Sequence, residues 1–253
     1  MKNIVLSEMT CPELSKYKEY VELALIPTGS HEQHGSNMTF AADTDIVYEI
    51  CKLLGKKFFP RILVCPPISY GISYHHMKFY GTITFRPETF ISIIMDIGWS
   101  LKQHGINKIL IVNAHGGNKP SLGIAIGKLK NELGIKASWI GGGSSTSNDL
   151  LNKRGISKIN GHSCEGEVSQ GMYIAPWLVR KDSLSAGKLK NSLYKEREWW
   201  WGEIPWSFEE ITENGALGDA TKSSVELGKE MTELILRRLE EFIRKYYFKD
   251  HSR

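Results

Sequence analysis

The chain has 253 residues, 41% of them hydrophobic, so it can bury a sizeable core in one large domain or two small ones. Its 32 basic and 28 acidic residues are interleaved and leave a net charge of +4, which gives no reason to expect binding to nucleic acid or to an anionic membrane. The four cysteines form no Cys-x-x-Cys pair, and no run of about eighteen apolar residues occurs. We therefore expect a single cytoplasmic, soluble domain over residues 1–253.

Short apolar runs alternate with segments of helical period along the first half of the chain. The runs that predict strands are rich in branched aliphatic residues and stop at Gly or Pro; they cover residues 22–27, 61–66, 108–114 and 136–141. The segments that predict helices repeat apolar residues every three or four positions and close on Lys or Gly; they cover residues 44–57, 87–105 and 119–134. This alternation predicts a mainly parallel sheet with helices on both faces.

The second half of the chain has less regular patterns. Residues 140–149 are rich in Gly and Ser, and we interpret them as a flexible loop after a strand. The segment 222–247 places its apolar residues on roughly one face, which predicts a packing helix. The segment "EWWWGEIPWSF" (198–208) holds more tryptophan than one small loop can bury. Because Trp is common at interfaces, we favour a subunit interface or a pocket lid over carbohydrate stacking.

Polar residues follow the predicted strands at the edge where open parallel sheets bind ligands. After the first strand, Glu32 and His34 lie two residues apart, so an extended chain can point both at one ion while Gln33 points away. Asp43 has two oxygens that can bridge two cations, and His115 follows the third predicted strand. Two carboxylates and two imidazoles suit zinc, manganese or iron(II) better than calcium.

Each of these residues also has a purely structural interpretation. Asp43 is a reasonable helix N-cap, and a Glu-x-His pair such as that of Glu32 is common by chance. His75 and His76, after the second strand, are interpreted as polar loop residues. The metal site is favoured because three separate strand ends bring ligand types to one crevice.

A further polar group lies in "GHSCEGEVSQG". His162 is either a capping or core histidine or a functional residue, and we favour function. Glu165 and Glu167 could be first-turn acids stabilised by a helix dipole. Cys164 is interpreted as a small buried residue, because nothing in the sequence indicates a lowered thiol pKa.

Five segments resemble the creatininase (creatinine amidohydrolase) family. "IPTGSHEQHGSNMTFAADTD" is similar to its Pro-x-Gly-Ser-x-Glu-Gln-His-Gly signature with Asp-Thr at a fixed distance. Four others follow in the family's order: "PPISYGISYHHMKFYGTITFRPETF", "NAHGGN", "GHSCEGEVSQ" and "ALGDATKSSVELGKE". The resemblance runs from Ile26 to Glu230 and implies a three-layer α/β/α sandwich with a binuclear metal site.

The resemblance also implies roles for single residues. Glu32, Asp43 and His115 would hold one ion, and His34 with the bridging Asp43 the other, so that one or two ions of zinc, manganese or iron(II) bind per subunit. His162 would serve in proton transfer near the substrate.

One position departs from the family pattern. Creatinine-hydrolysing members carry a glutamate ligand of the second metal two residues after the second histidine, where this chain has Gly117. Glu165 is our predicted replacement ligand and Glu167 the reserve; the carboxylate that is not a ligand would act with His162 as an acid or base. Creatinine is consequently not the expected substrate.

The resemblance implies a hydrolase that cleaves a C–N bond of a small cyclic amide, formamide or related compound by metal-activated water. The alternatives are a family member that hydrolyses a lactone or a ring C–C bond of a cyclic diketone, a cofactor-pathway peptidase, and a non-catalytic protein that binds metal or a small molecule. The expected partners are a small-molecule substrate and other copies of the chain in a homo-oligomer, such as the hexamers common in the family, with no nucleic acid and no membrane.

Overall fold

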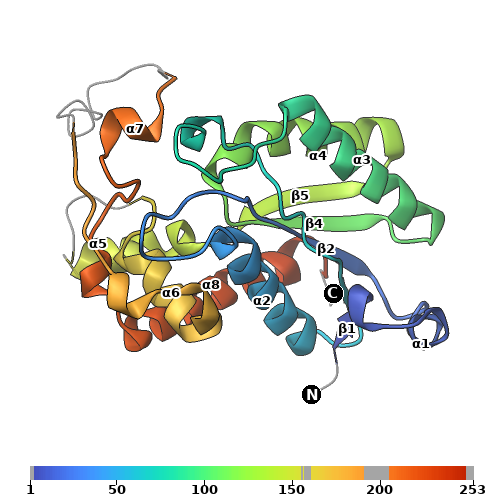
Figure 1. Cartoon of the computed structure of the whole chain (residues 1–253). Coiled ribbons are helices and arrows are strands. Elements are labelled where there is room, and N and C mark those ends of the chain that lie inside the picture. The colour runs from blue at the N-terminus through green and yellow to red at the C-terminus, as the bar shows by residue number, and fades with distance from the viewer. Residues whose placement is uncertain (1–2, 155, 157–160, 191–204, 249–253) are drawn as a thin grey trace.

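A parallel sheet forms the centre of the protein in a computed structural model, which describes residues 3–154, 156, 161–190 and 205–248 (Figure 1). Its five strands lie in the order β1-β3-β2-β4-β5, namely β1 (Ile4–Val5), β3 (Ile62–Val64), β2 (Leu23–Thr28), β4 (Lys108–Asn113) and β5 (Lys136–Gly141). All four pairings are parallel, as predicted. The sequence patterns missed β1, because two residues at a sheet edge are too short to show a period.

Helices cover both faces of the sheet. The long ones are α2 (Ala42–Lys57), α3 (Pro87–Gln103), α4 (Lys119–Leu133) and α8 (Val225–Tyr246). Side chains of β2 alternate between the two faces, because successive residues of a strand point in opposite directions. Leu23 and Leu25 pack into the core that contains residues of α2 and α8, whereas Ala24 and Ile26 pack into the core that contains residues of α3 and α4. The fold is therefore the expected α/β/α sandwich.

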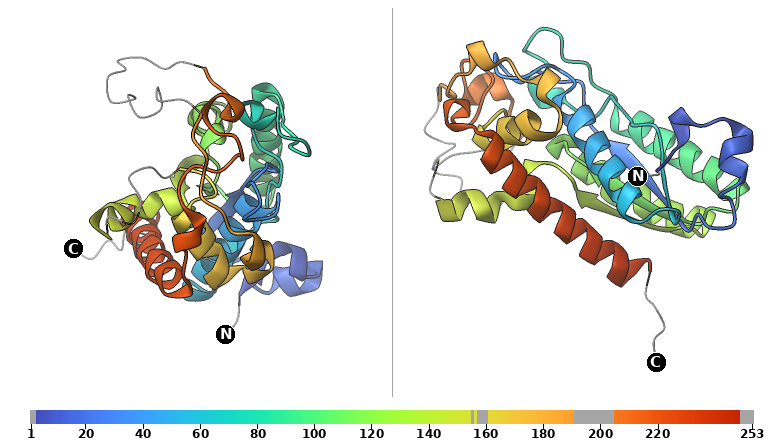
Figure 2. Two further views of the ribbon diagram at one scale, coloured as in Figure 1. Left: turned by 60° about the vertical axis from the view of Figure 1, so that its left-hand side comes forward. Right: turned by 90° about the horizontal axis from the view of Figure 1, so that it is seen from below.

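Shorter helices complete the end of the molecule beyond the sheet. Helices α5 (Asn148–Arg154), α6 (Glu165–Ile174) and α7 (Phe208–Ile211) lie at this end, whereas α1 (Cys11–Ser15) lies at the opposite end, beside β1 (Figure 1). Figure 2 shows from two sides that α6 lies against α8. The predicted loop at 140–149 is partly helical, since Ser144–Ser147 form a 3-10 turn that leads into α5. Across the residues described, no helix has the length and apolar character needed to span a membrane.

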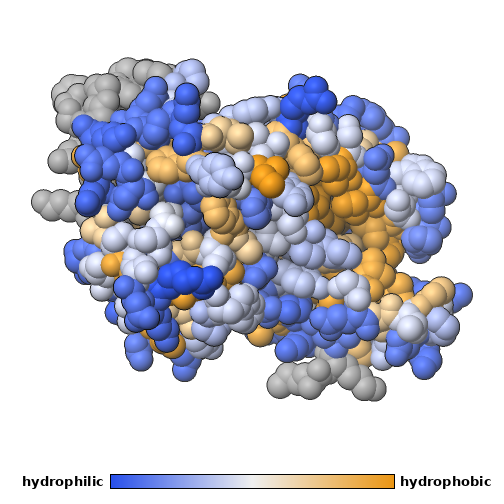
Figure 3. All heavy atoms as spheres, viewed as in Figure 1, coloured by the Kyte–Doolittle hydropathy of each residue, from blue (hydrophilic) through white to orange (hydrophobic). Residues whose placement is uncertain are grey.

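The surface is mixed in polarity. In the view of Figure 3, apolar side chains gather on the right, between α1 and α3. Partly buried residues of these two helices, among them Leu14 of α1 and Ile91 of α3, pack against the core on the α3 side of the sheet. This apolar surface lies away from the helices α6 and α8.

The N-terminus of α8 offers a test of the fold. Ser224 is its N-cap, and the hydroxyl accepts a hydrogen bond from the backbone N–H of Leu227 at 3.1 Å. Replacing Ser224 with alanine leaves that N–H without its partner, and we expect the free energy of unfolding to fall by about 1 kcal/mol. Urea denaturation measures the change. Ser224→Asp, which keeps an acceptor, should stay close to wild type, and equal losses in the two variants would contradict the capping role.

Candidate metal centre

The site lies where the chain reverses its direction across the sheet. From β2 the chain moves outward to β3 and then returns to β4 on the other side of β2. Thr28 and Asn113, the last residues of β2 and β4, are paired. A crevice forms at such a reversal, beyond the carboxyl ends of the strands. Glu32 and His115 follow these two ends and therefore meet there.

One group of ligand atoms is formed by Glu32, Asp43 and His115. The Nδ1 atom of His115 lies 3.1 Å from Oε2 of Glu32 and 3.3 Å from Oδ2 of Asp43, and all three side chains are buried. The Nε2–H of His115 donates to the carbonyl of Ile72 at 2.9 Å, which turns Nδ1 toward the carboxylates. Ligand atoms around a single zinc-like ion lie roughly 3 to 3.5 Å apart, and both distances from His115 fall in this range.

A second group contains His34, Asp43 and Glu167. The Nε2 atom of His34 lies 3.8 Å from Oδ1 of Asp43 and 3.6 Å from Oε2 of Glu167. Its Nδ1–H donates to the Glu32 carbonyl at 3.1 Å. Asp43 thus turns one oxygen to each group. Two buried atoms, His34 Nε2 and Asp43 Oδ2, have no hydrogen-bond partner among the described residues, and a cation would remove the cost of leaving them unpaired.

Asp43 does not cap its helix. Helix α2 begins at Ala42 and its N-cap is Ala41, so Asp43 lies inside the first turn. Asp45, two residues on, accepts a hydrogen bond from Nε1 of Trp177 at 2.7 Å near the surface. Residues two apart on a helix point in roughly opposite directions, which separates the two aspartates.

The same helical geometry separates the two glutamates of α6. Oε2 of Glu165 accepts from the backbone N–H of Asp219 at 2.9 Å, and Glu165 belongs to no group of metal-ligand type within the described chain. Oε2 of Glu167 accepts from the Ser163 N–H at 2.6 Å and faces His34. The geometry therefore turns Glu165, our expected replacement ligand, away from the centre and brings the reserve, Glu167, into it.

His162 and Gln33 lie beside the carboxylates. The Nε2–H of His162 donates to the Gln33 carbonyl at 2.6 Å, and its Nδ1 faces Oε1 of Glu32 at 3.6 Å. The Gln33 side chain, which we expected to point away, is buried and donates to the Gly215 carbonyl at 2.9 Å while contacting Nδ1 of His76 at 2.9 Å. Gln33 thus positions two imidazoles.

His75 and His76 are the site residues that sequence reasoning missed. The 3-10 turn Tyr74–His76 carries both into the crevice, where Nε2 of His76 lies 3.7 Å from Oε1 of Glu32. Phe208 at the start of α7 stacks on His76 with ring centroids 4.1 Å apart. Both residues follow the end of a strand, and the same rule that predicted His115 as a site residue could have identified them. Trp199, Trp200 and Trp201 lie outside the described residues, so the role of that cluster stays a prediction.

Burial and close packing shift the pKa values of the site. Burial disfavours the charged form of Glu32, but His115 and other imidazoles hold its pKa well below its usual range. Burial and the charge of Glu32 raise the pKa of Asp43 to about 6. Burial opposes the charged form of His34, yet the surrounding carboxylates raise its pKa to about 10, whereas burial and His34 lower that of His162 to about 4. Four neighbouring groups therefore have strongly unlike affinities for a proton.

The glycines after His115 provide a matched pair of variants. A Cβ atom on Gly117 would lie 2.0 Å from the Ile72 carbonyl oxygen and 2.6 Å from Nε2 of His115, whereas one on Gly116 would meet nothing within 4 Å. Gly117→Ala should therefore displace the hydrogen bond that orients His115. Loss of a hydrogen bond that orients a metal ligand typically lowers metal affinity or activity about 10- to 100-fold.

The comparison with Gly116→Ala decides whether the effect is local. We expect Gly116→Ala to keep wild-type metal affinity, because its methyl group enters open space. Metal titration with a chromophoric chelator measures both variants. Equal affinities in the two variants would show that Ile72 and His115 tolerate the added methyl group.

The fold and the site together define an α/β/α metal-dependent hydrolase. Within that class the chain belongs to the creatininase family, whose model, described as creatinine amidohydrolase, matches residues 7–243. The family resemblance read from the sequence is thus confirmed.

Known relatives carry different activities. The chain is 30% identical to a mycofactocin precursor peptide peptidase of Mycobacterium ulcerans, over 72% of this chain and 70% of the relative. It is 27% identical to a 3-dehydro-scyllo-inosose hydrolase of Thermotoga maritima, over 93% of this chain and 81% of the relative. A crystal structure of creatinine amidohydrolase superposes with a TM-score of 0.81 at 20% identity and covers 98% of this chain and 99% of its own. These matches support the fold and the family without selecting a substrate.

Proposed function

We propose that the protein uses metal-activated water to hydrolyse a C–N bond of a small cyclic amide, formamide or related compound. The observation that carries the proposal is the sharing of Asp43 between two buried ligand groups, with an unpartnered oxygen on Asp43 and an unpartnered nitrogen on His34. Glu32, Asp43 and His115 would hold one ion, and His34, Asp43 and Glu167 the other. Solved creatininases of similar fold include a zinc and a manganese form, and iron(II) also suits these donors.

The cation supplies two kinds of chemistry when bound: it lowers the pKa of a coordinated water to about 7, and it polarises a carbonyl oxygen. The protein contributes the proton transfers. Burial, the largest cause of the lowered pKa of His162, disfavours the protonated form of its ring. Its Nε2–H is fixed on the Gln33 carbonyl, so Nδ1 can accept a proton and pass it to the departing nitrogen. Such acid–base help contributes roughly 10²- to 10⁴-fold in rate.

Glu167 is the second candidate for proton transfer. Its carboxylate lies beside His34, and the Ser163 N–H fixes one oxygen. If only one ion binds, at Glu32, Asp43 and His115, then Glu167 is free to accept the proton of the attacking water. Glu167→Gln distinguishes the two roles, because a ligand role predicts loss of the second ion and a base role predicts loss of rate at constant metal content.

Elemental analysis of the purified protein tests the proposal most directly. We expect one or two equivalents of zinc, manganese or iron per chain, followed by hydrolysis of a cyclic amide or formamide in assays with the metal found. Short peptides and lactones belong in the same assays, because the peptidase is among the relatives. Protein without metal and without turnover would contradict the proposal and favour a binding protein.

Hydrolysis of a ring C–C bond is the second candidate function. It is favoured by the similarity over 93% of the chain to a protein named as an inosose hydrolase. A cyclic diketone included in the assays separates this reaction from C–N cleavage. The cytoplasmic location and the homo-oligomer, such as a hexamer, stay predictions, and light scattering coupled to size-exclusion chromatography tests the latter.

A further inference from the structure

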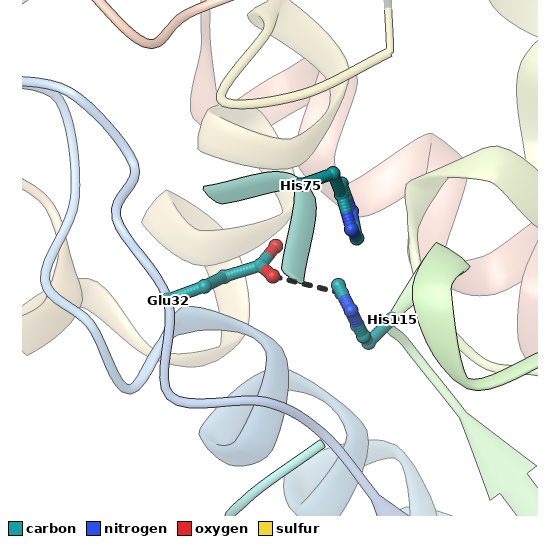
Figure 4. Close-up of side chains that lie close together, drawn as sticks. All are labelled: Glu32, His75 and His115. Atoms are coloured by element: carbon teal, nitrogen blue, oxygen red, sulfur yellow. Dashed lines mark ion pairs between the residues drawn. The ribbon is translucent and has the colours of Figure 1, made fainter. Parts of the chain in front are cut away.

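The third side chain beside Glu32 and His115 is that of His75. Figure 4 shows the Glu32 carboxylate and the His115 ring with His75 approaching from the turn above them. Ligand atoms of these three side chains all lie within 4.8 Å of one another. We propose that His75 is an additional, exchangeable ligand of the ion held by Glu32 and His115. The proposal rests on the metal-dependent function proposed above and specifies one further ligand of that site.

The turn that carries His75 is fixed to both of the other ligands. The Ile72 carbonyl accepts from Nε2 of His115 at 2.9 Å, and the Ser73 hydroxyl donates to Oε2 of Glu32 at 2.8 Å. The backbone N–H of Ile72 donates in turn to the Asn118 side chain at 2.9 Å. His75 therefore projects from a loop whose backbone is held against the site. Hydrogen bonds to Glu32 and His115 fix the position of this loop.

The absence of a side chain at position 117 leaves room for this imidazole. A Cβ atom on Gly117 would lie 2.8 Å from Cε1 of His75, closer than the two atoms can approach. The rings of His75 and His115 lie nearly parallel, 12° apart, with centroids at 5.5 Å. His75 thus fills the space that a larger residue at position 117 would need.

His75 differs from the other imidazoles of the site in how it is held. His34, His76, His115 and His162 each have one ring nitrogen in hydrogen-bond contact with a protein group. Within the described residues, neither ring nitrogen of His75 has such a partner, and its ring is only half-buried. A ligand without a hydrogen bond on its second nitrogen is weakly oriented. The ring can therefore bind the ion and leave it again.

Metal affinity and cobalt spectroscopy test the proposal on the full-length protein. His75→Ala is compared with wild type and with His31→Ala. This control removes a half-buried imidazole that stacks on Phe40 at 5.2 Å and belongs to none of the ligand groups found among the described residues. We expect His75→Ala to bind Zn²⁺ about 10- to 100-fold more weakly. The visible spectrum of the Co²⁺ form should change in His75→Ala, and added imidazole should restore it.

Each outcome separates the ligand role from the proposed function. Wild-type affinity and an unchanged Co²⁺ spectrum in folded His75→Ala would overturn the proposal while leaving the metal-dependent function intact, even if activity falls. A wild-type protein that binds no metal would overturn both. If His75→Ala does not fold, His75→Gln serves instead, and the same loss of affinity and shift of the spectrum are expected.

Discussion

Replacing Asp43 with asparagine is expected to remove at least one metal ion per chain and to lower activity by more than about 100-fold. The magnitude follows because loss of mere support for a ligand already costs about 10- to 100-fold. Asparagine keeps the shape of the side chain but offers one oxygen and no negative charge. It can therefore serve only one of the two groups that Asp43 faces. Elemental analysis and an activity assay on the same sample measure the two effects.

Asp45 provides the matched control for this substitution. It lies in the same turn of α2, but its carboxylate accepts from Trp177 near the surface and belongs to no ligand group among the described residues. Asp45→Asn should change metal content and activity by no more than about twofold, as is usual for surface changes. The bridging role would be refuted by an Asp43→Asn protein that keeps both its metal and its activity.

Removing the metal with a chelator is expected to lower the melting temperature by roughly 10 °C. An ion present at about 1,000 times its Kd contributes about 4 kcal/mol to the folded state. In a chain of this size, 1 kcal/mol corresponds to about 2–4 °C. We expect the metal to stabilise the fold because Glu32 and Asp43 are buried carboxylates that repel each other when no cation lies between them. Differential scanning fluorimetry with and without added Zn²⁺ or Mn²⁺ measures the shift.

The size of this thermal shift should increase with pH. Without metal, burial opposes the charged form of His34 but its carboxylate neighbours raise its pKa to about 10, so at pH 7 the ring carries a proton that the metal must displace. A raised folded-state pKa also stabilises the metal-free protein below about pH 6.5, and that stability is lost as the pH rises toward 10. Both effects arise from one proton, and its loss widens the gap between pH 6.5 and 8.5. Burial opposes the charged form of His115, but Glu32 and Asp43 raise its pKa as well, so a shift that stays constant or shrinks over this range would contradict the assignment of His34 and His115 as ligands.

Much of the scaffold follows from local patterns. The central strands β2, β3, β4 and β5 are continuous apolar runs because both faces of the sheet are covered, and such runs are visible in the sequence. The edge strand β1 was missed because its pairing with β3 depends on contacts far along the chain. The helical part of residues 140–149 was missed because Gly and Ser have low helix propensity.

Site residues could be predicted where a metal-binding residue type directly follows a strand. They could not be predicted where membership of the site depends on the direction in which a side chain points. Glu32, His34 and His115 follow strand ends, and the parallel topology brings such ends together. The choice between Glu165 and Glu167 depends on the rotation of α6 about its axis, which its packing against α8 sets and two-residue spacing does not reveal. His75 and His76 also follow the end of a strand, but the irregular turn that directs their side chains into the crevice has no periodic pattern.

If both of the proposed ions bind, the sharing of Asp43 links their sites thermodynamically. An ion at the first site orders this carboxylate and keeps it deprotonated, which favours the second ion, while repulsion between the two cations opposes it. The balance sets a single coupling factor, and the second ion must change the affinity for the first by the same factor. Metal content will therefore not rise as two independent saturation curves. Under the two-ion proposal, the number of ions per chain would then depend on the concentration of free metal.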